Sequence, residues 1–300
     1  MGDSQSTPYD SGTFSCRTEE LNWQVKWLKA RYKILTLREC VAVVHGEREL
    51  EANSVLLTFD DGYRDNFEEA FKVLKSHDAS GTFFLPTAFV GTGRMPWWDT
   101  IAYIVKNSKR AEITLEYPER MTFKIAEPAR TRSIRAILNQ YKRPETVESE
   151  MFLRGLEEAC ACGRPDDDAE RCFMTWDEAR EMQASGMCFG GHSHTHRIMG
   201  KLPYELQLEE LEISRCILEK ELGTEVDSFA YPVGHRNSFT EVTFKALREA
   251  RYRTAFSFYS GINQPGMTDP FSVLRAGITE ESHALFQLRI ALRMATGRDL

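Results

Sequence analysis

The sequence predicts an α/β fold in which short parallel strands alternate with amphipathic helices. Apolar runs of strand length are each followed by a turn and a helix that carries its own capping signal. This unit recurs several times along the 300 residues. A hydrophobic content of 42% with 28% charged residues is sufficient for one sizeable core. The alternation favours a parallel sheet, either open or closed into a barrel.

The first unit begins with the apolar run 55–59, which has the length of a strand. A helix is predicted directly after it, because Asp65 and Glu68 have the spacing of a capping box. One face of that helix is apolar: Phe67, Ala70, Phe71 and Leu74. Residues 81–85 form the next predicted strand.

Further units are predicted in the C-terminal half of the chain. One helix begins at the capping signal 175–178, a second spans 203–222, and a third begins at the capping signal 238–241 and reaches Ala250. Gly186 and Gly223 are placed to end the first two helices. The intervening strands are predicted over 187–190, 228–231 and 254–257.

The stretch from about 97 to 172 interrupts this alternation, and we interpret it as an insertion in a single domain spanning 15–300. It contains charge-rich helical segments at 130–141 and 148–160 and a weak strand near 113–115. A lid and a pair of surface helices both fit this pattern, and the second is favoured because no chemistry is visible in it. Residues 1–14 are polar and are expected to form a flexible tail.

The composition argues against several classes of protein. The net charge is -7 with acids and bases interleaved, so a nucleic-acid partner is not expected. No apolar run approaches the roughly 18 residues of a transmembrane helix. The polar start lacks the pattern of a secretory signal, which predicts a cytoplasmic location for the chain as written.

Cysteine usage points to reduced thiols rather than to disulfides. The chain has seven cysteines, an odd number scattered along its length. Cys160, Cys162 and Cys172 cluster, but a structural zinc site needs a fourth ligand, and none is near in sequence. Ordinary thiols are therefore the favoured interpretation.

Two acidic side chains follow the first predicted strand. Residues 58–62 read Thr-Phe-Asp-Asp-Gly and place Asp60 and Asp61 where the strand ends. In parallel α/β folds active sites are built on that edge, although a lone Asp-Asp-Gly is more often a solvated turn. Gly62 permits the turn that would let both carboxylates enter one cleft.

Three histidines follow another predicted strand, in the segment 190–196, which reads Gly-Gly-His-Ser-His-Thr-His. His192 and His196 are four residues apart and share one face if the chain coils there. A single histidine would be explained by surface water, but the pair favours a metal. Two imidazoles and one carboxylate form an open catalytic zinc site that holds a water. Of Asp60 and Asp61, one would bind the metal and the other would act as general base.

These motifs resemble those of the polysaccharide deacetylase family, the carbohydrate esterases that remove N-acetyl groups from chitin-like and peptidoglycan sugars. Residues 58–62 match its Thr-Phe-Asp-Asp-Gly motif, and 192–196 match its His-Ser/Thr-x-x-His motif. The resemblance covers about 55–278. It implies an irregular (β/α)7 barrel with a helical insertion, Asp60 as the base, and Asp61, His192 and His196 as ligands of Zn²⁺ or another divalent transition metal.

Two further motifs of the family are incomplete in this chain. Ala230 stands where the family has the arginine that orients the base, whereas the following Pro-x-Gly turn implies an oxyanion donor at the Val233 N–H. Arg275 stands where a Leu-x-His motif would place the general acid. His235, next to the turn, is the substitute we assign to the catalytic residues; His283 and Asp60 itself are other routes for the proton.

Several aromatic and polar side chains are candidate contacts for a sugar: Tyr63, Trp97, Trp98, Asp99, Tyr231 and Arg275. Indoles can stack on a sugar ring, although adjacent tryptophans are at least as often packing residues. The expected reaction is metal-dependent removal of N-acetyl groups from an N-acetylglucosamine-containing polysaccharide or glycan. A cyclic-amide (ureide-type) hydrolase acting on a small metabolite, and a carbohydrate-binding module with a structural metal, stay open as alternatives.

Overall fold

The structure is a computed structural model that describes residues 9–143, 148–165, 172–261, 263–264, 266, 268–278 and 282–296. The chain divides into two compact units. Unit 1 contains residues 15–92 and 172–300, and unit 2 contains residues 3–14 and 93–171.

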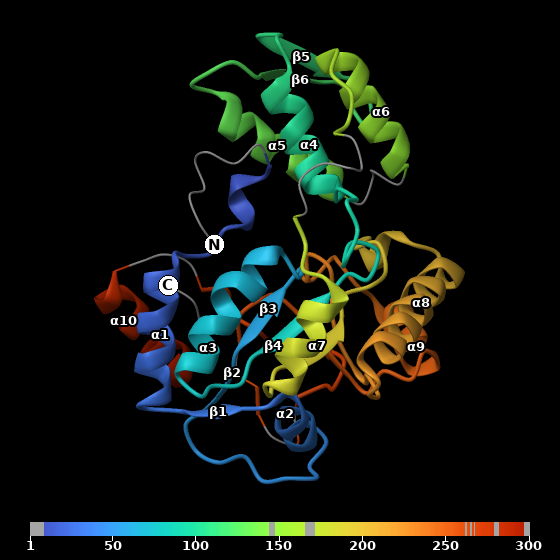
Figure 1. The fold of residues 1–300 in the computed structure, drawn as a ribbon. Helices are drawn as coiled ribbons and strands as arrows, with labels where there is room; N and C mark the ends of the chain where they lie inside the picture. The colour runs from blue at the N-terminus through green and yellow to red at the C-terminus, as the bar shows by residue number, and fades with distance from the viewer. Residues whose placement is uncertain are drawn as a thin grey trace. The chain divides into compact units, whose positions relative to one another are not determined.

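Unit 1 is built on a five-stranded parallel sheet with the order β3-β4-β7-β8-β9. These strands are β3 (Thr58–Asp60), β4 (Thr82–Leu85), β7 (Cys188–Gly191), β8 (Ser228–Ala230) and β9 (Thr254–Phe256). Figure 1 shows β3 and β4 in unit 1 with helices α3 and α7 beside them. A separate parallel pair joins β1 (Lys33–Leu35) to β2 (Ser54–Leu56). The predicted parallel sheet is confirmed.

Helices precede, connect and follow the strands of unit 1. They are α1 (Thr18–Lys29), α2 (Leu37–Val44), the π-helix η2 (Asn66–Phe71) continuing into α3 (Lys72–Ser76), α7 (Trp176–Ala184), the 3₁₀ turn η3 (Met199–Lys201), α8 (Tyr204–Leu222), α9 (Glu241–Glu249) and α10 (His283–Thr296). Every described helix is too short or too polar to cross a bilayer.

Two of the predicted helix signals are confirmed. Thr175 and Glu178 form the capping box of α7, and Gly223, at φ 66°, ends α8 in the left-handed conformation that suits glycine.

The capping signal at 238–241 is also confirmed, with Thr240 as the N-cap of α9 and Thr243 as its partner in the capping box. The capping box predicted at Asp65 is wrong, because Asp65 has helical backbone angles and its side chain caps no backbone N–H. Asp65 instead accepts a hydrogen bond from the Asn66 side chain.

Strand register aligns the aromatic core of unit 1. Phe59 pairs with Phe83, and Phe83 pairs with Phe189 on the next strand. Their ring centroids are 4.9 Å and 5.8 Å apart. This ladder fixes the relative height of β3, β4 and β7, and therefore the height at which each strand ends.

Unit 2 contains the region expected to be an insertion. The helices predicted there are confirmed as α5 (Arg130–Lys142) and α6 (Ser149–Cys160). The weak strand is β5 (Glu112–Leu115), paired in an antiparallel hairpin with β6 (Met121–Lys124), which the sequence did not predict. Another unpredicted element is α4 (Trp97–Asn107). The single-domain organisation stays a proposal.

The described part of the expected tail, residues 9–14, differs from the prediction. It contains a 3₁₀ turn, η1 (Ser11–Thr13), capped by Asp10. Asp10 is buried, and its N–H donates a hydrogen bond of 2.9 Å to Asp99 of α4. Satisfying a buried carboxylate fixes this segment on unit 2, which a composition-based prediction of mobility could not detect.

Candidate metal centre

The carboxyl ends of three strands of the parallel sheet, β3, β7 and β8, converge at the site. Asp60 is the last residue of β3, Gly191 ends β7 and Ala230 ends β8. Beyond β3 the chain turns through two residues with positive φ, Asp61 at 73° and Gly62 at 71°. The predicted turn at Gly62 is confirmed, and Asp61 shares the left-handed conformation, which aspartate tolerates better than most residues.

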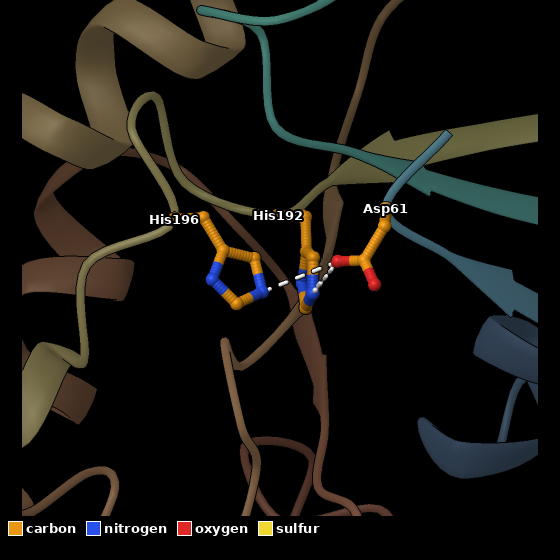
Figure 2. Close-up of side chains that lie close together, drawn as sticks. All are labelled: Asp61, His192 and His196. Atoms are coloured by element: carbon orange, nitrogen blue, oxygen red, sulfur yellow. Dashed lines mark ion pairs between the residues drawn. The ribbon is translucent and has the colours of Figure 1, made fainter. Parts of the chain in front are cut away.

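Three side chains meet beyond these strand ends (Figure 2). The Nε2 atoms of His192 and His196 lie 3.5 Å and 3.2 Å from Oδ1 of Asp61. The three candidate ligand atoms all lie within 4.8 Å of one another. The two histidines converge as expected, but through a turn rather than a helical coil, with Ser193 at φ 60° and His196 at φ 56°.

The donor set of this site fits a cation. The Nδ1 atom of His192 lies 2.7 Å from the carbonyl oxygen of Ala230, so Nδ1 carries a proton, and in the neutral imidazole the lone pair of Nε2 faces Asp61. Within the described part of the chain, the buried Oδ1 atom of Asp61 accepts no hydrogen bond. Lone pairs that converge without a donor between them are stabilised by a bound cation.

Electrostatics favour the ligating forms of two of these groups. Burial alone would raise the pKa of the Asp61 carboxyl, but its contacts with the imidazoles of His192 and His196 outweigh burial and hold the pKa well below its ordinary value. Burial lowers the pKa of His196, which favours the neutral imidazole. Asp61, His192 and His196 are the one group of side chains with metal-ligand geometry among the described residues. Cys160, Cys162 and Cys172 form no such group there.

Arg275 holds Asp60 in place. Its Nη1 and Nη2 atoms donate to the two oxygens of Asp60 at 2.7 Å and 2.8 Å, a bidentate ion pair. Nη1 also donates to Thr58, and Nε donates to the carbonyl of Ser257. The Arg275 side chain is 8% exposed, and its guanidinium carbon lies 5.3 Å from the centroid of the Phe84 ring and 5.8 Å from that of the Phe258 ring.

This contact corrects two expectations about Arg275. Four hydrogen bonds to the protein leave it poorly placed to bind substrate, the role expected from sequence. It instead pairs with Asp60 from another part of the chain, a contact that Ala230 cannot make. The sequence showed an arginine at 275 but had no signal for its partner, which lies 215 residues away.

The two residues proposed at the Pro-x-Gly turn, Val233 and His235, follow the end of β8. Val233 has φ 66°, and no hydrogen bond within the described residues engages its N–H. His235 is exposed, with its ring 6.4 Å from that of Phe258. Phe258 is itself 42% exposed, and its N–H donates to the carbonyl of Gly234.

Several predicted contacts are packing residues instead. Tyr231 is 1% exposed, stacks on Phe239 and donates to the carbonyl of Phe271, so the sugar contact expected of it is wrong. Tyr63 is half-buried and stacks on Phe173. His283 lies against Trp23 and Glu20 of α1, which removes it as a proton donor at the site.

Trp97, Trp98 and Asp99 are buried in unit 2 at 8%, 5% and 0% exposure. Trp97 stacks on Tyr141 with a centroid separation of 4.3 Å, and Asp99 accepts the N–H of Asp10. The expected sugar contacts at these three positions are therefore wrong, because the large apolar area of the indoles is used for packing.

Comparisons with known proteins agree with this geometry. A family model described as polysaccharide deacetylase matches residues 47–117 and 119–255. A curated relative, the putative polysaccharide deacetylase YxkH of Bacillus subtilis, is 34% identical over 74 residues. That alignment spans 24% of this chain and 26% of the relative, so the chain matches about a quarter of the relative's length.

Two solved structures share the fold. The Streptococcus pyogenes deacetylase PplD, in complex with acetate, has a TM-score of 0.57 at 17% identity over 87% of this chain and 81% of that one. IcaB from Ammonifex degensii has a TM-score of 0.57 at 20% identity over 90% and 87%. The predicted fold class, a deacetylase-type (β/α)7 barrel, is confirmed.

Proposed function

Because the chain belongs to the polysaccharide deacetylase family, we propose that it is a metal-dependent amide hydrolase that removes N-acetyl groups from an N-acetylglucosamine-containing glycan. One observation carries this proposal: two imidazoles and a carboxylate converge as a metal-ligand group next to a second carboxylate that an arginine orients. The two carboxylates lie at the end of one strand, Asp60 as its last residue and Asp61 directly after it, where parallel α/β enzymes place their chemistry.

Asp61, His192 and His196 would hold Zn²⁺ or another divalent transition metal. When bound there, such an ion supplies Lewis-acid activation of water and of the acyl oxygen.

The other residues of the site would carry the proton transfers. Asp60 takes the proton of the attacking water on its carboxylate, while Arg275 keeps that carboxylate in one orientation. The Val233 N–H donates to the developing oxyanion. His235 donates a proton to the leaving nitrogen as the carbon–nitrogen bond breaks, so that acetate and an amine are released.

Acetate release tests the function. The zinc-loaded protein is incubated with N-acetylglucosamine oligomers, and free acetate and free amine should appear in equal amounts. Glucosamine oligomers, which carry no acetyl group, serve as the control and should release none. Binding of the acetylated oligomers without acetate release would contradict the proposal and favour a carbohydrate-binding module.

Replacing Arg275 by Ala should lower kcat about tenfold to a hundredfold while KM and bound metal change little, because the lost contact orients Asp60. Added guanidinium should restore part of the rate. Steady-state kinetics on acetylated oligomers measures both parameters. Arg236→Ala removes an exposed arginine nearby and should leave kcat unchanged. A raised KM with unchanged kcat would instead support direct substrate binding by Arg275.

A further inference from the structure

The segment between the two histidine ligands is held by a carboxylate from another element. Glu210 lies on α8 and is 7% exposed. Its Oε2 atom accepts the N–H groups of His194 at 2.9 Å and of Thr195 at 2.7 Å. Its Oε1 atom accepts the hydroxyl of Thr195. Within the described residues Glu210 forms no ion pair, and its hydrogen bonds all go to His194 and Thr195.

The same segment is anchored on its other side by the chain that follows β4. The Ala88 N–H donates to the carbonyl of His194 at 2.9 Å, and the Thr87 N–H donates to the carbonyl of Ser193 at 3.3 Å. The ring of His194 meets the Thr87 hydroxyl at 2.9 Å, which turns this third histidine away from the metal-ligand role. Hydrogen bonds with α8 on one side and with the segment after β4 on the other therefore hold the turn in place.

The hydrogen bonds on both sides of the turn matter because the turn has an unfavourable backbone conformation. Ser193 and His196 both have left-handed φ angles, which cost free energy in residues other than glycine. That conformation directs His192 and His196 toward the same oxygen of Asp61. Without Glu210, two N–H groups at the centre of the turn would lose their acceptor, and the strained conformation would lose its support.

We infer that Glu210 is a positioning residue that sets the metal affinity of the site. It acts through the backbone of His194 and Thr195, because it touches neither ligand side chain. The inference rests on the metal-dependent site of the proposed function. Outer partners of this kind commonly change metal affinity by about 10- to 100-fold.

The affinity for Zn²⁺, measured by competition with a chromophoric chelator, tests this role. Glu210→Ala should weaken binding about tenfold or more. Glu210→Gln should stay within about threefold of wild type, because its amide oxygen can still accept both N–H groups. The matched control is Glu209→Ala, which removes an exposed carboxylate one residue away and should have no effect. Wild-type affinity in a folded Glu210→Ala protein would overturn the inference.

Amide hydrogen exchange in the metal-free protein gives a second readout. The amides of His194 and Thr195 should exchange slowly in wild type and faster in Glu210→Ala, and equal rates would also overturn the inference. If Glu210→Ala does not fold, Glu210→Asp, which withdraws the carboxylate by one methylene, replaces it with the same expected direction. Neither readout uses substrate, so a wild type that binds zinc but releases no acetate would defeat the deacetylase proposal alone.

Discussion

Replacing Asp61 by Asn is expected to weaken zinc binding by about a hundredfold and to abolish acetate release at zinc concentrations that saturate the wild type. Zinc sites with four ligands bind with about 10–16 kcal/mol, so one charged ligand contributes about 3 kcal/mol, which is two powers of ten in affinity. Asparagine keeps the shape of the side chain and tolerates the φ of 73° at this position. The measurement is zinc content after dialysis, together with acetate release.

A matched control exists elsewhere in unit 1. Asp78 also has a left-handed backbone, at φ 46°, and its side chain is fully exposed. Asp78→Asn therefore makes the same substitution in the same conformation without touching the site, and it should retain both zinc and activity. If Asp61→Asn retained one equivalent of tightly bound zinc, Asp61 would not be a ligand.

The alternation of strands and helices could be predicted because each unit has a local signal. Where pairing is non-local, the prediction failed in detail. The run 55–59 was expected to be one strand, but it divides at Leu57 into β2 and β3. β2 pairs with β1, whereas β3 pairs with β4. Nothing in a single apolar run indicates that its two halves have different neighbours.

The candidate ligands could be predicted because each motif is contiguous in sequence and ends a strand. The residues that hold these ligands and Asp60 in place could not be predicted, because they come from elements distant in sequence. Arg275 appeared as a substitute for a histidine, and only the fold shows that its guanidinium reaches Asp60. Glu210 is one of several glutamates on α8, and only its burial separates it from exposed neighbours such as Glu209.

Aromatic residues produced most of the wrong site assignments. Tyr231 and Trp97 are large and lie near strand ends in the sequence, which fits sugar binding and core packing equally well. Burial separates the two interpretations, because Tyr231 and Trp97 are only 1% and 8% exposed. The apolar area of an aromatic ring drives both outcomes, so residue type alone could not distinguish them.

Replacing Asp60 by Asn is expected to lower kcat by about a thousandfold, within the range of about 10²–10⁴ that general bases contribute. The amide retains an oxygen for the Arg275 guanidinium but cannot take the proton of the attacking water. Zinc content should stay near one equivalent, because the proposed ligands are Asp61, His192 and His196. Acetate release from acetylated oligomers and zinc content are measured on the same preparation.

The comparison of Asp60→Asn with Asp61→Asn separates the two carboxylates more sharply than either variant does alone. The residues are adjacent, and each variant removes one negative charge and little volume. A general effect of charge or folding would therefore change zinc content and turnover alike in both proteins. The geometry predicts instead that zinc is retained in the first variant and lost in the second, because only Asp61 contacts both imidazoles. Wild-type turnover in Asp60→Asn would assign the proton transfer to another group.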